Sequence, residues 1–154
     1  MIRHIFWDWN GTLTDDAALL YEAVNSAMTA IGHPRVSGEP AAHSDPQPVL
    51  TADALAALQR CGAAGRTQSV LSRWPADDPL ARVAATTLLP YLEGIRGANW
   101  PEEPKEDMVR RELVLRKLDP AQALLIGDTD DDAPPSTWHS PCERAIALRM
   151  DRPL

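Results

Sequence analysis

Residues 2–16, with the sequence IRHIFWDWNGTLTDD, constrain the fold of this chain more than any other stretch. An apolar run ends at Asp8, and the pair Asn10–Gly11 then predicts a tight turn. Thr14 or Asp15 is expected to cap the helix that follows. The pattern puts a carboxylate at the end of a strand, beside backbone amides and the positive end of a helix. Such a place suits phosphate and a divalent cation.

The rest of the chain alternates between expected strands and expected helices. Strands are predicted over residues 2–7, 67–71, around Ile95, 123–126 and 145–148, and helices up to about residue 31, then over 52–60, 78–91 and 104–118. The first helix has apolar residues at the spacing of one helix face, namely Leu20, Val24, Ala27, Met28 and Ile31. This alternation predicts an α/β fold, with a parallel sheet covered by helices on both faces.

Length and composition predict one domain over residues 1–154, in which the proline-rich residues 33–50 form a loop. No apolar stretch approaches the length of a membrane span, and the net charge of −7 with few basic clusters argues against a nucleic-acid partner. Cys61 and Cys142 share no motif and are expected to be reduced thiols. We therefore expect a cytoplasmic protein that binds neither membrane nor nucleic acid.

Polar residues recur where the predicted parallel strands reach their carboxyl ends. They are residues 8–13, Ser72, Lys105 and residues 127–132. Ligands of open α/β sheets bind at this edge, so these residues are the candidate site. The four histidines show no pairing typical of a zinc site, and of Trp7 and Trp9 one is expected in the core and one near the site.

These motifs, in this order and at these spacings, resemble those of the haloacid dehalogenase-like phosphohydrolases, in particular the phosphoglycolate phosphatase-like branch. DWNGTL resembles the first motif, an apolar strand followed by DxDGT, and SVLS, ending at Ser72, resembles the second. Lys105 resembles the third motif and LLIGDTDDD the fourth, so the likeness runs from residue 2 to about residue 133. It implies a three-layer Rossmann-like fold and magnesium-dependent hydrolysis of a small phosphomonoester.

The resemblance also implies roles for individual residues. Asp8 would be the nucleophile that forms an aspartyl-phosphate, and Mg²⁺ would be held by Asp8, the backbone carbonyl of Asn10, Asp128 and Asp132, with Asp131 as the alternative to Asp132. Gly11, Thr12, Ser72 and Lys105 would bind the phosphate. From the residues alone, Ser72 is equally typical of a helix cap, Lys105 of a solvated helix start and Asn10 of an ordinary turn.

The chain departs from the family pattern in three places. Asn10 stands where the family has an acid–base Asp, and an amide exchanges no proton near neutral pH. Since general acid–base catalysis typically contributes ~10²–10⁴-fold, we expect a slow enzyme. Residues 33–50 are too few for a full cap domain, so the site is expected to be open unless a second copy of the chain covers it. Residues 133–141 interrupt the helix expected after Asp132.

These departures support an alternative function. The chain would then be a weak or inactive remnant of such an enzyme that binds phosphate or a protein. A receiver domain fits less well, because its acidic pair should follow the first strand and its phosphoacceptor a central one. The sequence contains no GxxxxGK[ST] segment, which excludes a P-loop.

Overall fold

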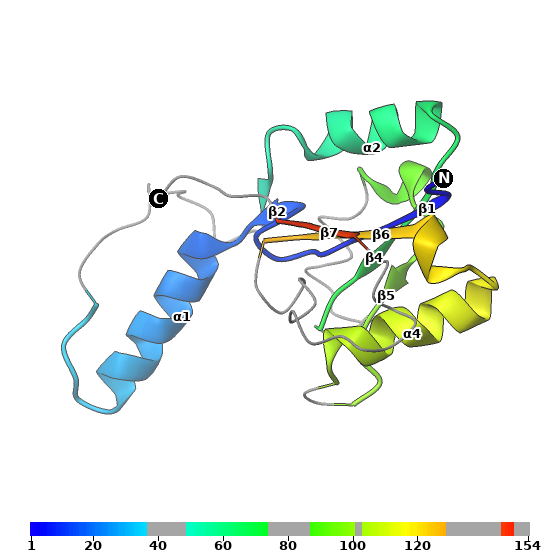
Figure 1. The fold of residues 1–154 in the computed structure, drawn as a ribbon. Helices are drawn as coiled ribbons and strands as arrows, with labels where there is room; N and C mark the ends of the chain where they lie inside the picture. Colours follow the sequence, from blue (N-terminus) through cyan, green and yellow to red (C-terminus); the bar gives the residue numbers. More distant parts are fainter. Residues whose placement is uncertain (37–48, 74–86, 101–102, 129–145, 150–154) are drawn as a thin grey trace.

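The computed structural model describes residues 1–36, 49–73, 87–100, 103–128 and 146–149. Its centre is a five-stranded sheet in the order β5-β4-β1-β6-β7, in which all neighbouring strands are parallel. The strands are β1 (His4–Trp7), β4 (Thr67–Leu71), β5 (Ile95–Arg96), β6 (Ala123–Gly127) and β7 (Ile146–Arg149). The predicted parallel α/β architecture is confirmed (Figure 1).

The central strand β1 is buried on both faces, as its apolar sequence predicts. Successive side chains of a strand alternate between faces. Ile5 and Trp7 accordingly join one core cluster, which includes Leu58, and Phe6 joins a second, which includes Val109. The sheet therefore has a hydrophobic core on each side.

In the described part of the chain, each of these cores is covered by a helix. On one face lies α2 (Ala54–Ala63), and on the other lies α4 (Lys105–Arg116) (Figure 1). Short 3₁₀ turns, η1 (Leu89–Tyr91) and η2 (Pro120–Gln122), precede β5 and β6. The predicted helices over 52–60 and 104–118 are confirmed with shifts of one to three residues at their ends. Most of the helix predicted over 78–91 lies outside the described residues.

The segment after the turn differs from the prediction. Thr14 and Asp15 form strand β2 (Thr14–Asp15), which pairs antiparallel with β3 (Val49–Leu50). They therefore do not cap a helix. Because their backbones belong to this ladder, α1 (Ala17–Ala30) starts only after Asp16.

Helix α1 extends away from the sheet rather than lying across it (Figure 1). Val24 is 40% and Ile31 68% exposed, so the apolar face identified in the sequence does not cover the sheet. Among the side chains of residues 21–30 of this helix, the buried one is Asn25, whose Oδ1 accepts a hydrogen bond of 2.7 Å from the backbone N–H of Val36. Helical spacing predicted the helix correctly but not what it packs against.

The expectation for the two tryptophans was wrong. Trp7 and Trp9 are both 4% exposed and belong to the same core cluster. The physical reason is their spacing, since residues two apart on an extended backbone point to the same face. In the described part of the chain, no helix is both long and apolar enough to cross a membrane.

Candidate active site

The carboxyl ends of the three inner strands come together at one edge of the sheet. Trp7 of β1 is in register with Val70 of β4 and with Ile126 of β6. The residues that follow these strands, Asp8, Ser72 and Asp128, therefore emerge at the same edge. The backbone N–H of Asp8 donates to the carbonyl oxygen of Ile126 at 2.8 Å, which extends the ladder by one residue and fixes where Asp8 leaves the sheet.

Lys105 is the first residue of α4, and its ammonium donates a hydrogen bond to Oδ1 of Asp8. Lys105 is 6% and Asp8 8% exposed. Two charges removed from water in this way are stable only when they are paired. The burial excludes the interpretation of Lys105 as part of a solvated helix start. Helix α4 thus places a fixed positive charge beside the carboxylate at the end of β1.

Asp128 is held by the turn that follows Asp8. The hydroxyl of Thr12 donates to Oδ1 of Asp128 at 3.0 Å, and the backbone of Gly11 lies directly against the same carboxylate. A Cβ atom added to Gly11 would lie 2.2 Å from Oδ2 of Asp128, and Gly11 has φ +73°. Glycine is therefore required here both by conformation and by space. Within the described structure, Thr12 orients Asp128.

The same turn contains a contact that the sequence did not indicate. The side-chain amide of Asn10 donates to Oδ2 of Asp16 at 2.5 Å, and the backbone N–H of Gly11 donates to Oδ1 of Asp16 at 3.1 Å. Asp16 is the residue just before α1. The N–H of Gly11 was expected to face a phosphate, but it is already bonded to a carboxylate. The available signal was an acidic residue at a predicted helix start, six positions after Asn10.

Ser72 follows β4 and is 5% exposed, and its backbone N–H donates to the carbonyl oxygen of Arg96 at 3.0 Å. Its position at the edge agrees with the predicted phosphate site. Asp131 and Asp132, the further acids of the fourth motif, lie outside the described residues. So does the proline-rich stretch after them.

The donors at this edge fit a magnesium ion. They are all oxygens, from the carboxylates of Asp8 and Asp128 and the backbone carbonyl of Asn10, and Mg²⁺ prefers such oxygens in small number with several waters. The carboxylate of Asp128 occupies the place that a Cβ on Gly11 would need, so glycine at position 11 lets Asp128 lie against the turn. No group of three or more His, Cys, Asp or Glu side chains is clustered for metal binding anywhere in the described ranges.

A cavity of about 490 Å³ lies at the opposite edge of the sheet, at the amino ends of β1 and β4. His4 is one of its lining residues and is fully buried. Its ring nitrogens bond to the hydroxyls of Thr67 at 2.6 Å and Ser69 at 2.9 Å. Burial, together with the nearby charge of Arg116, lowers the pKa of His4 to about 4. The candidate catalytic groups are at the other edge, so this cavity is a separate feature.

Several solved structures with a similar fold are described as haloacid dehalogenase-superfamily hydrolases or as predicted phosphatases. A haloacid dehalogenase-like family hydrolase from Streptococcus pneumoniae is 22% identical, with a TM-score of 0.67 over 85% of this chain and 78% of its own. A protein from Haemophilus somnus described as a predicted phosphoglycolate phosphatase is 16% identical, with a TM-score of 0.67 over 85% and 79%.

A superfamily hydrolase from Ehrlichia chaffeensis is 14% identical, with a TM-score of 0.67 over 97% of this chain and 87% of its own. No protein-family model matches the sequence, and no curated protein matches it. The likeness is thus one of structure, and it agrees with the sheet order and with the resemblance of the motifs. The chain has the fold of the haloacid dehalogenase-like hydrolases.

Proposed function

We propose that the chain is a magnesium-dependent phosphohydrolase that cleaves a small phosphomonoester through a covalent phosphoryl group on Asp8. One observation carries the proposal, namely the buried ion pair between Asp8 and Lys105 at the carboxyl edge of the sheet, next to Asp128. A carboxylate that is charged and buried at this edge has no evident structural task. Two proteins with a similar fold are described as predicted phosphatases, which supports the reaction class.

In the first step, a carboxylate oxygen of Asp8 attacks the phosphorus atom and the ester P–O bond breaks. The leaving alkoxide takes a proton and departs as an alcohol. Lys105 fixes the Asp8 carboxylate and offsets the negative charge of the incoming phosphate. Ser72 would bind a phosphate oxygen through its hydroxyl group. Holding nucleophile and phosphate in line is the main contribution that a protein makes to this chemistry.

In the second step, the oxygen of a water molecule attacks the phosphorus atom and the bond to Asp8 breaks. Inorganic phosphate leaves and the Asp8 carboxylate is restored. Two proton transfers are required in all, one to the leaving group and one from water. Asn10 performs neither. We assign them to Asp16, whose carboxylate is hydrogen-bonded to Asn10 and Gly11 in the loop directly after the nucleophile.

Magnesium, when bound between Asp8, Asp128 and the carbonyl of Asn10, would neutralise charge on the transferring phosphoryl group. The chain's own residues prepare the place for it. Thr12 holds Oδ1 of Asp128, and Gly11, which has no Cβ, lets that carboxylate lie against the turn. Asp132 remains a proposed further ligand. The site is expected to take a small phosphorylated substrate, and a second copy of the chain is one way to cover it.

The test is hydrolysis of p-nitrophenyl phosphate and acetyl phosphate by the full chain with magnesium, with chelator and with Asp8→Asn. We expect turnover that requires both the metal and Asp8. Intact-mass measurement after acetyl phosphate should show one added phosphoryl group in the wild type and none in Asp8→Asn. Glu22→Gln is the control, because Glu22 is an exposed carboxylate on α1 that pairs with Arg35.

Turnover that survives both the chelator and Asp8→Asn would contradict the proposal. Magnesium-dependent phosphate binding without any turnover would favour the alternative, a remnant that binds phosphate. Asn10 is the observation that keeps this alternative in view, because it removes a proton-transferring group from the loop. The two functions are therefore separated by one set of measurements.

A further inference from the structure

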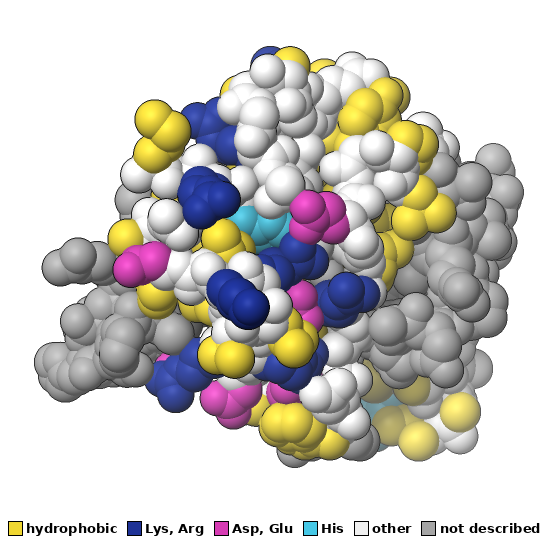
Figure 2. Space-filling view, turned by 90° about the vertical axis from the view of Figure 1, so that its right-hand side faces the viewer, with side chains coloured by type: hydrophobic (Ala, Val, Ile, Leu, Met, Phe, Trp, Pro, Cys, Tyr) yellow, Lys and Arg dark blue, Asp and Glu magenta, His cyan; other side chains and the backbone are white. Residues whose placement is uncertain are grey.

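The cavity at the amino edge of the sheet has a charge opposite to that of the whole protein. Its lining includes three arginines, Arg3, Arg66 and Arg116, and one acid, Glu93. Three guanidinium groups against one carboxylate leave an excess of two positive charges, whereas the chain carries −7. Figure 2 shows this side of the molecule, where Lys and Arg side chains gather over the middle of the face. A local reversal of charge of this kind attracts anions.

The three arginines come from separate parts of the chain. Arg3 precedes β1, Arg66 precedes β4 and Arg116 ends α4. The parallel register of β1 and β4, in which His4 pairs with Thr67, brings the first two side by side. Because the arginines are far apart in the sequence, they form no basic run that sequence inspection could detect.

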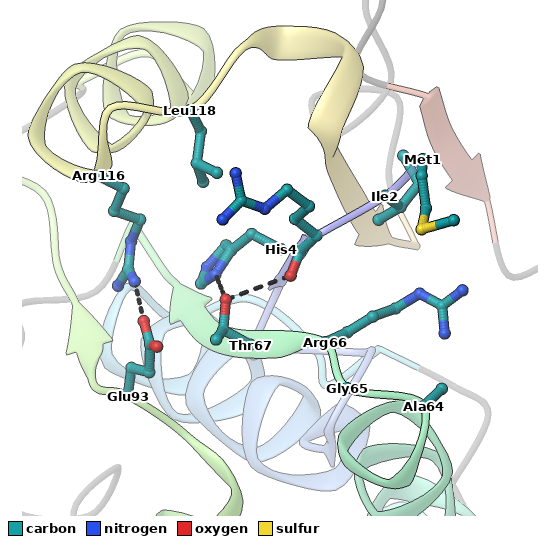
Figure 3. Close-up of a pocket in the computed structure, with 11 residues that line it drawn as sticks. Met1, Ile2, His4, Ala64, Gly65, Arg66, Thr67, Glu93, Arg116 and Leu118 are labelled. Atoms are coloured by element: carbon teal, nitrogen blue, oxygen red, sulfur yellow. Dashed lines mark hydrogen bonds and ion pairs between the residues drawn. The ribbon is translucent and has the colours of Figure 1, made fainter.

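Two of the three guanidinium groups are available for a ligand. Arg116 is already engaged, with ion pairs to Glu93 and Glu112. Arg3 is exposed and Arg66 half-buried, and neither has a carboxylate partner among the residues that the structure describes. Arg116 and Glu93 lie on one side of the cavity and Arg66 on the other, with His4 and Thr67 between them (Figure 3). Glu93, the acid in the described lining, is paired with Arg116, so no ion pair to Arg3 or Arg66 is found in the part of the chain that the structure describes.

The floor of the cavity contributes no charge of its own. His4 is fully buried and bonded to two hydroxyl groups, and its low pKa keeps it neutral near pH 7. Apolar side chains, including Ile2 and Leu118, form other parts of the wall. A ligand that suits both kinds of wall carries an anionic group and an organic part. The volume of about 490 Å³ lies in the range of small-molecule sites.

We propose that this cavity binds a small organic phosphate, whose phosphate oxygens are held by Arg3 and Arg66. Guanidinium groups bind phosphate with paired hydrogen bonds, which makes arginine the preferred residue for this task. A long polyanion fits less well, because the molecule as a whole is strongly acidic and would repel the remainder of the strand. The site lies at the opposite edge of the sheet from Asp8, so it is a second binding site, independent of the proposed hydrolysis.

The test is calorimetric titration of the full chain with pyrophosphate, ADP and, as the uncharged analogue of ADP, adenosine. We expect pyrophosphate and ADP to bind, and adenosine to bind at least tenfold more weakly than ADP. The double variant Arg3→Gln/Arg66→Gln should lose tenfold or more in affinity for both anions. Arg110→Gln is the matched control, because Arg110 lies on α4, pairs with Glu106 and does not line the cavity. Its affinities should equal those of the wild type.

A single conservative variant helps to separate loss of ligand binding from loss of the fold. Arg66→Lys keeps the charge but not the paired donors, and it should bind pyrophosphate more weakly than the wild type and more tightly than the double variant. Circular dichroism shows whether each variant is folded. Absence of anion binding by the wild type, or equal binding by the folded double variant, would overturn the proposal. A single-stranded oligonucleotide that binds more tightly than ADP through the same arginines would overturn the assignment to a small molecule.

Discussion

The side-chain amide of Asn10, two residues beyond the proposed nucleophile Asp8, donates to the carboxylate of Asp16 at 2.5 Å. The other oxygen of that carboxylate accepts from the backbone N–H of Gly11 at 3.1 Å. The turn thus contains an amide at position 10 and an acid at position 16, joined by a hydrogen bond. Exchanging the two residues, with aspartate at position 10 and asparagine at position 16, keeps a hydrogen bond between an amide and a carboxylate. The effect of this exchange on turnover can be measured.

We predict that Asp16→Asn lowers turnover by roughly 10²–10³-fold, within the usual contribution of general acid–base catalysis. The loss should be larger for phenyl phosphate than for p-nitrophenyl phosphate, because a poor leaving group needs a proton more. The exchanged pair Asn10→Asp/Asp16→Asn restores one acid and one amide and should recover most of the activity on phenyl phosphate. Steady-state kcat values for the two esters check this.

Glu22→Gln, on helix α1, controls for the loss of an exposed carboxylate elsewhere in the chain. Equal losses on the two esters in Asp16→Asn would show that Asp16 supports the turn and transfers no proton. An active wild type with a fully active Asp16→Asn would remove Asp16 from the mechanism but leave the role of Asp8 intact. An inactive wild type would remove both Asp8 and Asp16 from the proposed mechanism.

The Asp8–Lys105 pair leads to a prediction about stability. Lys105→Met should lower the free energy of unfolding by about 3–5 kcal/mol, because it removes the cation that pairs with a buried carboxylate. Adding Asp8→Asn to Lys105→Met removes that charge and should recover much of the loss. Urea denaturation of the wild type, both single variants and the double variant completes the cycle. Additive effects of the two substitutions would contradict the coupling.

Gly11 and Gly32 form a natural comparison. They have φ values of +73° and +75°, but a Cβ on Gly11 would meet Asp128, whereas one on Gly32 would meet nothing within 4 Å. Both Gly→Ala changes should therefore cost similar backbone strain, roughly 1 kcal/mol. Gly11→Ala alone should also weaken the binding of magnesium, since it displaces the Asp128 carboxylate.

The magnesium concentration that gives half-maximal hydrolysis checks this difference between the two variants. We expect it to rise at least several-fold in Gly11→Ala and to stay at the wild-type value in Gly32→Ala. Equal values in the two variants would mean that Asp128 does not hold the metal.

Short sequence patterns predicted the elements of this fold that depend mainly on neighbouring residues. Apolar runs predicted the strands, and β4 has the bounds expected from residues 67–71. The carboxyl-edge rule for parallel sheets placed Asp8, Ser72 and Asp128 together, because it requires only that the strands be parallel. The alternation of strand side chains would also have placed Trp7 and Trp9 on one face, had it been extended past the end of β1.

Contacts that depend on the path of the chain were not predictable in this way. Helical spacing on α1 could not reveal that the helix leaves the sheet, because spacing describes the helix and not its neighbour. Thr14 pairs with Leu50, which is 36 positions away, so its commitment to β2 has no local signal. The bond from Asn10 to Asp16 requires the turn geometry, and the arginine cavity requires the register of β1 against β4.

The buried histidine of β1 gives a pH-dependent stability. The pKa of His4 is about 4 in the folded chain and 6.5 for an ordinary histidine, chiefly because burial penalises the charged form. Between these values the unfolded chain binds the proton and the folded chain does not. Stability is therefore fully present above pH 6.5 and falls as the pH drops toward 4. From pH 7 to pH 5 the loss attributable to His4 should be about 2 kcal/mol.

Urea denaturation of the wild type and of His4→Gln at pH 7 and pH 5 measures this loss. Glutamine can still bond to the hydroxyls of Thr67 and Ser69 but does not titrate, so the stability of His4→Gln should fall less with pH than that of the wild type. His33→Gln, at an exposed position, is the matched control and should follow the wild type. The same fall in His4→Gln as in the wild type would mean that carboxylates, not His4, set the acid sensitivity of the fold.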